Sequence, residues 1–450
     1  MSKAALSGKY AAYPEYKDSG VEWIDAIPSD WVVSKVKYLA PFQVGWTPPT
    51  KVDANFIGDN LWANISDLKG KHIVRTAKNI SDEAAKAASM EISPEGSLLY
   101  SFKLSVGAVS FVSQDMYTNE AIASFLEGGS LPLSYMYYAL PKFLIENAST
   151  NIYGARILNQ ELINNAFLLA PLYTEAEKIA NFLDHETAKI DTLIEKQQQL
   201  IKLLKEKRQA VISHAVTKGL PSSTGSKAPM RDSGVEWLGK VPAHWEMVPL
   251  KYLCRFSGGG TPSKDNLSYW TGGNIPWVSP KDMKSFWVSD TQDKLTKKAV
   301  EESSTNFVEA GALLMVVRSG ILQRTIPIAI NTVRVTLNQD MKALKFNERM
   351  DAEYAANYIL GSVSSLLLEW SKDGATVESI EQEYLSGSLI SVPPIEEQHA
   401  INVEVSGRMA VFQELENQAA KGIALLQERR TALISAAVTG KIDVRNWKAV

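Results

Sequence analysis

The sequence predicts an α+β fold in which two homologous mixed α/β domains are separated by a pair of long antiparallel coiled-coil helices, with internal pseudo-two-fold symmetry. Two duplications carry this prediction. A heptad pattern of apolar residues occurs twice, so that Val405 corresponds to Leu183 and Leu433 corresponds to Val211. The hexapeptide that begins at Asp18 also recurs unchanged at 232–237. Self-similarity on this scale marks repeated structural units, so it sets the layout of the whole chain.

The heptad pattern predicts one helix from Glu175 to Gly219 and a second from Glu397 to Gly440. Apolar residues at alternating steps of three and four form a seam along which two helices pack. The predicted seam residues are Leu183, Ile190, Ile194, Ile201, Leu204 and Val211 in the first copy and Val405, Met409, Phe412, Ile423, Leu426 and Leu433 in the second. Because the seam is long and appears twice, we favour helix-on-helix packing over a single amphipathic face on a core. Polar Gln197 and Glu416 within the seam either fix its register or lie at a solvent-open part of the pair.

The repeats also predict the domain boundaries. The segments are 1–39 at the N-terminus, 40–170 for the first domain, 171–220 for a central helical region, 221–253 for a linker and the repeated N-terminal segment, 254–392 for the second domain, and 393–450 for a C-terminal helical region. Inside the domains, Trp62 answers Trp277 and Gly96 answers Gly311. The spacing between copies grows along the chain, which indicates extra residues in the surface loops of the second domain.

Local patterns indicate the elements within each domain. Short apolar runs between Leu98 and Val112, and between Leu313 and Ile330, are typical of strands and hairpins. The stretches 135–145 and 354–370 are predicted to be helices that pack on the sheets. A run rich in serine and glycine at 219–228 predicts a flexible joint.

Composition and motifs exclude several classes of protein. The 450 residues are 45% hydrophobic and 22% charged, as is ordinary for soluble globular proteins. No apolar run is long enough to span a membrane and no signal core precedes Pro14, so we expect a cytoplasmic protein without membrane contact. The single cysteine, Cys254, is expected in the core. The five histidines have no metal-ligand spacing and no phosphate-binding loop is found, so we expect no catalytic residues, no bound metal and no cofactor bound directly by this chain.

The formal net charge of −3 argues at first against nucleic-acid binding, although a basic stripe on an acidic body gives the same total. Two similar domains held apart suit a divided DNA site. Residues 183 to 211 span about 42 Å as a helix, close to one DNA turn of about 34–36 Å. The candidate DNA contacts are Lys69, Lys71, Arg75, Lys103 and Arg156 in the first domain and Lys264, Lys281, Lys284, Arg318, Arg324 and Lys372 in the second. Lys103 and Arg318 follow equivalent strands and are the favoured pair, whereas Trp62 and Trp277 fit a core role better than base contact.

Several motifs together resemble one known family. They are the segments Asp18 to Trp31 and Asp232 to Trp245, the run Asn274 to Met283, the run Val392 to Gln398, and the two closing helices that end in Ser-x-Ala-Val-Thr. The chain resembles the specificity subunit of a type I restriction-modification system over nearly its whole length. The first copy departs from the pattern, because Asn60 to Leu68 lacks the Pro-Trp pair and Pro171 to Ala176 lacks the Glu-Gln pair.

The resemblance implies two target-recognition domains joined by two conserved helical regions. It implies a non-catalytic subunit that reads a bipartite site in double-stranded DNA, one half-site per domain, and positions two methyltransferase (modification) subunits, with two restriction/translocase subunits where these are present. S-adenosylmethionine is then bound by the methyltransferase subunits, and ATP and Mg by the restriction subunits. The alternative from another class is a coiled-coil scaffold protein without a DNA-binding role.

Overall fold

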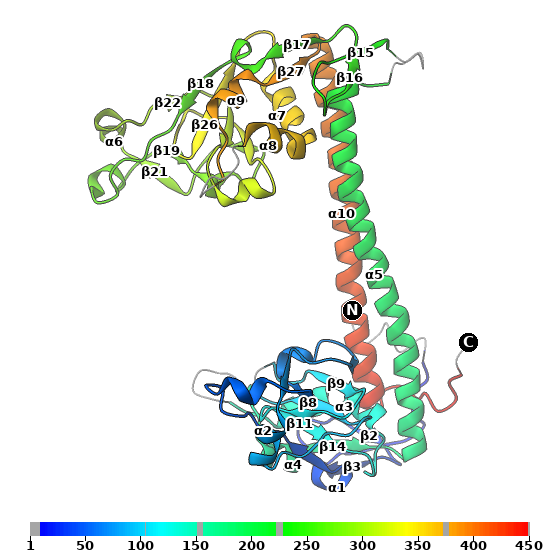
Figure 1. The fold of residues 1–450 in the computed structure, drawn as a ribbon. Helices are drawn as coiled ribbons and strands as arrows, with labels where there is room; N and C mark the ends of the chain where they lie inside the picture. The colour runs from blue at the N-terminus through cyan, green and yellow to red at the C-terminus, as the bar shows by residue number, and fades with distance from the viewer. Residues whose placement is uncertain (1–9, 104, 151–155, 222–227, 372–377, 449–450) are drawn as a thin grey trace. The chain divides into compact units, whose positions relative to one another are not determined.

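The computed structural model describes residues 10–103, 105–150, 156–221, 228–371 and 378–448 (Figure 1). The chain divides into two compact units. Unit 1 comprises residues 1–198 and 421–450, and unit 2 comprises residues 199–420. Each unit contains one mixed α/β domain and a part of both long helices, α5 (Tyr173–Lys218) and α10 (Ile395–Val438). The central part of the predicted flexible joint, residues 222–227, lies outside the described residues.

Unit 1 is built on a five-stranded sheet with a three-stranded sheet beside it. The five strands, in spatial order, are β4 (Phe42–Val44), β11 (Ile122–Phe125), β8 (Leu98–Ser101), β9 (Val109–Val112) and β6 (His72–Ile73). The three strands are β10 (Tyr117–Thr118), β5 (Asn60–Ala63) and β7 (Lys78–Ile80). Two-stranded pairs join β1 (Tyr16–Lys17) to β2 (Ile27–Pro28), β3 (Val32–Lys35) to β14 (Phe167–Ala170), and β12 (Ser149–Thr150) to β13 (Arg156–Ile157). The α-helices of this domain are α1 (Val36–Leu39), α2 (Asp82–Ala87), α3 (Leu133–Phe143) and α4 (Gln160–Asn165).

Unit 2 repeats the order of the five-stranded sheet and adds one strand to the second sheet. Its five-stranded sheet has the order β18 (Cys254–Gly258), β26 (Met341–Phe346), β23 (Leu313–Val316), β24 (Ile328–Asn331) and β20 (Trp287–Val288). Its second sheet has the order β21 (Asp293–Leu295), β19 (Ile275–Val278), β25 (Val335–Leu337) and β22 (Phe307–Val308). The short pairs are β15 (Met230–Asp232) with β16 (Lys240–Pro242), and β17 (Glu246–Pro249) with β27 (Leu389–Val392). The helices of this domain are α6 (Lys297–Glu302), α7 (Ala352–Gly361), α8 (Val363–Trp370) and α9 (Gln382–Gly387).

Corresponding strands occupy corresponding places in the two sheets. The turn before the central strand also needs the same residue in both units. Gly96 precedes β8 with φ +88°, and Gly311 precedes β23 with φ +79°, a region of backbone conformation that favours glycine. The predicted duplication of a mixed α/β domain is therefore confirmed at the level of strand order.

The two long helices pack antiparallel within each unit (Figure 1). In unit 1, Arg430 of α10 pairs with Asp191 of α5 at 2.9 Å. Both helices start after prolines and carry acidic residues in the first turn, where the helix dipole favours negative charge. The predicted seam residues are all buried or partly buried: Leu183, Ile190, Val405 and Leu433 are buried, and Ile194, Ile201, Leu204, Val211, Met409, Phe412, Ile423 and Leu426 are partly buried.

Each domain is attached to the last turn of one long helix by a buried tyrosine. The hydroxyl of Tyr135 in α3 lies 3.4 Å from the carbonyl oxygen of Val438, at the end of α10. The hydroxyl of Tyr354 in α7 lies 3.2 Å from the carbonyl oxygen of Val216, near the end of α5. Burial raises the pKa of both phenols, so both remain neutral donors.

One predicted helix is divided in the structure. Residues 354–370 form two helices, α7 and α8, because Ser362 between them has non-helical φ and ψ of −123° and 17°. The preceding Gly361 lies against α5, where an added Cβ would come within 2.9 Å of a Val216 methyl group. Glycine is a weak helix former, so this close contact and the helix break occur together.

Candidate nucleic-acid interface

A buried tryptophan anchors a loop at the same place in each unit. Trp62 is 5% exposed, and its indole N–H donates to the carbonyl of Trp46 at 3.0 Å. Trp277 is 4% exposed, and its indole N–H donates to the carbonyl of Gly260 at 3.0 Å. Both tryptophans therefore belong to the core, and each holds the loop that contains its acceptor carbonyl. Buried side chains of this kind are not placed to contact bases.

The same tryptophans fix a second loop through matched bonds. The backbone N–H of Trp62 donates to Thr76 Oγ1 at 3.3 Å, and that of Trp277 donates to Thr291 Oγ1 at 3.1 Å. A capping box follows the strand that holds each tryptophan. Asn64 and Asp67 form it after β5 in unit 1, and Ser279 and Asp282 form it after β19 in unit 2. A rigid frame of this kind lets the exposed loop residues differ between units without changing the fold.

Lys103 and Arg318, the favoured pair, lie just beyond the ends of the central strands β8 and β23. Both are exposed. Arg318 donates from Nε to Asp340 Oδ1 at 2.8 Å, while the ammonium of Lys103 lies 6.0 Å from the centre of the Phe102 ring. The two cations thus occupy equivalent positions but differ in what holds them.

Two other predicted contacts in unit 1 are engaged within the protein. Lys71 is half-buried and bonds Asp184 of α5 at 2.5 Å, with its ammonium 5.4 Å from the Tyr137 ring. Arg156 donates to the carbonyl of Ile145 at 2.7 Å. Both residues therefore make contacts within unit 1, as Arg318 does with Asp340 in unit 2, and their contact with DNA stays a prediction.

The remaining predicted cations lie on exposed loops and turns. Lys69 and Arg75 lie on either side of β6, Lys264 lies between β18 and β19, Lys281 and Lys284 lie after β19, and Arg324 follows a short turn after β23; all are exposed. Lys372 lies outside the described residues. These residues are exposed, as their charge indicated, but they lie on several different loops.

The parts of the chain that the structure describes also bear on metal and membrane binding. Within those ranges, no three histidine, cysteine or acidic side chains gather as a metal site. No described helix has the length and apolar character that crossing a membrane requires. Cys254 is buried in the core of unit 2, and burial raises the pKa of its thiol to about 12.

Comparison with known proteins gives consistent matches over this architecture. The sequence model of the type I restriction modification DNA specificity domain matches the chain twice, over residues 28–203 and 242–406. The EcoR124I/EcoR124II specificity subunit of Escherichia coli is 40% identical over 178 residues, which is 40% of this chain and 43% of that relative. The MjaIX specificity subunit of Methanocaldococcus jannaschii is 22% identical over 97% of this chain and 98% of its own length.

Two solved structures share the fold. A chain of a type I R-M system assembly superposes with a TM-score of 0.66 at 14% identity, covering 92% of this chain and 99% of that chain. The HsdS subunit from Thermoanaerobacter tengcongensis superposes with a TM-score of 0.53 at 14% identity, covering 92% of this chain and 98% of that chain.

Proposed function

This chain belongs to the type I restriction-modification DNA specificity family, and from that premise we propose that it reads a bipartite DNA site, one half-site per unit. Specificity subunits recognise DNA sequence and are themselves non-catalytic, and this chain is such a subunit. The observation that carries the proposal is the duplicated domain, whose frame is the same in both units while its exposed residues differ. Two related but different readers select two related but different half-sites.

The arrangement of the helices also separates this proposal from a coiled-coil scaffold. Oligomerisation through the heptad seam requires the seam to be free. Within unit 1, however, Leu183, Ile190 and Leu433 are 0%, 5% and 1% exposed and already belong to one hydrophobic core. The seam is used inside the chain.

We propose further that two modification subunits bind, one on each unit. Unit 1 exposes Leu193 of α5 and Leu425 of α10, at 47% and 50%, and unit 2 exposes Leu415 of α10 and Leu203 of α5, at 41% and 60%. Leu193 answers Leu415, and Leu203 answers Leu425, at the constant offset of the heptad repeat. Exposed leucines on a helix are a frequent site for partner helices, and their repetition supports two equivalent partner sites.

The chemistry then belongs to the partners. In the proposed complex the modification subunits bind S-adenosylmethionine and methylate adenine, and restriction subunits, where present, use ATP and Mg. The complex acts on cytoplasmic DNA. The acidic net charge of this chain fits such an assembly, because partner subunits can supply much of the contact with phosphates.

The test is co-expression of the chain with its modification subunits in a host without adenine methylation, followed by mapping of methylated adenines. We expect methylation at a motif of two defined parts separated by an undefined spacer. Methylation without such a motif, or a motif that survives deletion of this chain, would refute the proposal. A scaffold would leave methylation independent of this chain.

A further inference from the structure

Each unit carries a tight turn with a different polar residue at its tip. The turn is Asn119-Glu120-Ala121 in unit 1 and Asn338-Gln339-Asp340 in unit 2. In each, the asparagine side chain accepts from the backbone N–H two residues on, at 3.1 Å in unit 1 and 3.0 Å in unit 2. The asparagine N–H bonds the end of the neighbouring strand, at the carbonyls of Ala63 and Val278 respectively. The two turns are therefore built alike, and only the residues after asparagine differ.

A threonine holds the side chain at each tip. The Thr47 hydroxyl donates to the Glu120 carboxylate, and the Thr261 hydroxyl donates to the Gln339 amide oxygen. Each threonine precedes a buried proline, which restricts its backbone to an extended conformation. The residue before each threonine is the one whose carbonyl accepts from the core tryptophan. The tip residue is thus positioned from the core outward.

A glycine allows the threonine loop to approach the turn. A Cβ added to Gly45 would lie 1.9 Å from the Thr118 carbonyl oxygen, and one added to Gly259 would lie 1.9 Å from the Asn338 carbonyl oxygen. No side chain fits at either position. The close approach is therefore a shared requirement of both units.

The strand-end cation lies beside each tip. Phe102 N–H donates to the Ala121 carbonyl at 3.0 Å, and Val317 N–H donates to the Asp340 carbonyl at 2.8 Å. Lys103 and Arg318 follow directly in sequence. Each unit consequently presents one fixed polar tip next to one cation, with Gln339 and both cations exposed and Glu120 half-buried.

We infer that Glu120 and Gln339 are base-reading residues, one for each half-site. This inference rests on the proposed function. A glutamate carboxylate only accepts hydrogen bonds and suits the amino group of cytosine, whereas a glutamine amide both donates and accepts and suits adenine N6 and N7. Lys103 and Arg318 beside them bind phosphate or a guanine edge. Thr47 and Thr261 are positioning residues, since each holds the side chain at the tip through a hydrogen bond.

A purely structural role for the tips makes a different prediction, which the reciprocal substitutions separate. Glu120→Gln and Gln339→Glu keep the side-chain shape and the oxygen that accepts from threonine. If the tips only secure the loop, recognition stays the same. If they read bases, the preferred base changes, because donors appear or disappear at the reading edge.

The experiment maps methylated adenines made by the complex of this chain with its modification subunits, for wild type and for each substitution. We expect Glu120→Gln to change the base preference at one position of one half-site, and Gln339→Glu to do so in the other half-site, with methylation of the wild-type site reduced roughly ten-fold or more. Glu127→Gln and Gln382→Glu, the same exchanges at exposed positions elsewhere in each unit, serve as matched controls.

The remaining outcomes are also decisive. Unchanged site and rate in both variants overturn the inference, as does a change in both half-sites from one substitution. Where a folded complex loses methylation, selection of bound DNA from a randomised library decides: a shifted base supports the inference, and an unshifted site overturns it. Thr261→Val removes the hydroxyl that holds Gln339 and should weaken the base preference at the position that Gln339→Glu changes. Thr261→Ser keeps the hydroxyl and should keep the wild-type preference. Absence of any divided motif with the wild-type chain counts against the proposed function instead.

Discussion

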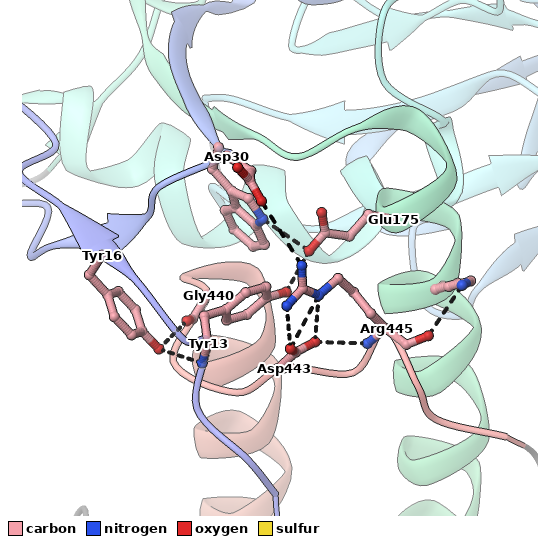
Figure 2. Close-up of polar contacts among 9 residues, drawn as sticks. Tyr13, Tyr16, Asp30, Glu175, Gly440, Asp443 and Arg445 are labelled. Carbon is pink, nitrogen blue, oxygen red and sulfur yellow. Dashed lines mark hydrogen bonds and ion pairs between the residues drawn. The ribbon is translucent and has the colours of Figure 1, made fainter.

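Glu175 and Glu397 occupy equivalent positions in the first turns of the two long helices, but their surroundings differ. Glu175 is 6% exposed and accepts from the Tyr13 hydroxyl at 2.6 Å and from the Trp31 indole at 3.1 Å (Figure 2). Glu397 is partly exposed and pairs with the exposed His244 at 2.7 Å. The indole N–H of Trp245, which answers Trp31, has no hydrogen-bond partner among the described residues. The same junction therefore holds two buried hydrogen bonds to the glutamate in unit 1 and a partly exposed ion pair of the glutamate in unit 2.

The difference arises from Tyr13, Asp443 and Arg445, which contact one another in unit 1. Asp443 binds the Arg445 guanidinium at 2.7 Å, and the guanidinium lies 4.9 Å from the centre of the Tyr13 ring (Figure 2). Burial and the bond to Glu175 raise the pKa of Tyr13, so it stays a neutral donor. The pKa of the Asp443 carboxyl is lowered: burial raises it, but the bonds from Arg445 outweigh that effect. The duplicated sequence thus gives two different junctions. A buried hydrogen-bond network stabilises the one in unit 1, and a partly exposed ion pair stabilises the one in unit 2.

The largest expected difference between the units concerns the helix seam. Leu433 is 1% exposed in the core of unit 1, while Val211 at the equivalent place in unit 2 is only partly buried. We expect Leu433→Ala to lower the free energy of unfolding of unit 1 by about 3 kcal/mol and Val211→Ala to lower that of unit 2 by about 1 kcal/mol. Hydrogen exchange of peptides from each unit measures both, and equal losses would contradict the comparison.

The next effect tests the junction. Glu175→Gln removes the charge from a buried acceptor of two hydrogen bonds and should destabilise unit 1 by about 2 kcal/mol. Glu397→Gln weakens a pair that water already screens and should change unit 2 by less than about 1 kcal/mol. Unfolding monitored by exchange in each unit distinguishes them. A larger effect in unit 2 would show that the exposed pair is the stronger one.

A smaller effect should be the same in both units. Tyr135→Phe and Tyr354→Phe each remove a buried hydroxyl that bonds the end of a long helix. Each should lower the stability of its own unit by about 1 kcal/mol, because a hydroxyl that donates to two backbone carbonyls is lost and both carbonyls are left with fewer partners. Tyr16→Phe, at a tyrosine that is 40% exposed, is the control. Clearly unequal losses would mean that the two docking contacts are not duplicates.

The smallest effect concerns Cys254, which has no counterpart in unit 1. Because burial raises its pKa to about 12, the thiol stays protonated in the folded protein at neutral pH. Its contribution to stability is fully present below the ordinary thiol pKa of about 8.5 and is lost as the pH rises toward the folded value. Alkylation at pH 8 should therefore be slow until unit 2 unfolds. Rapid alkylation of the native protein would contradict the burial.

The duplication made the fold predictable from sequence, because each weak local pattern could be checked against its copy. The long helices and the central strands were predicted near their observed bounds. The break at Ser362 was not, since it depends on how closely Gly361 approaches α5, a tertiary contact without a local signal.

The site was less accessible to sequence reasoning. The pattern of basic residues indicated Lys103 and Arg318 at equivalent strand ends, but it also indicated Lys71, which is bonded to Asp184 within the protein. Glu120 and Gln339 are not basic, so this pattern did not indicate them. The signal that could have found them was the repeated asparagine before each one, at Asn119 and Asn338, since a turn kept in both copies with a different tip is where two readers would differ.

The central claim is that each unit reads its own half-site, and one exchange within the chain tests it directly. Residues 40–170 are replaced by a second copy of residues 254–392, which joins the helices at equivalent positions. Methylated adenines are then mapped for the complex with the modification subunits. The account predicts a symmetric site made of two inverted copies of the half-site that unit 2 reads. An active complex that still methylates the original asymmetric site would contradict it.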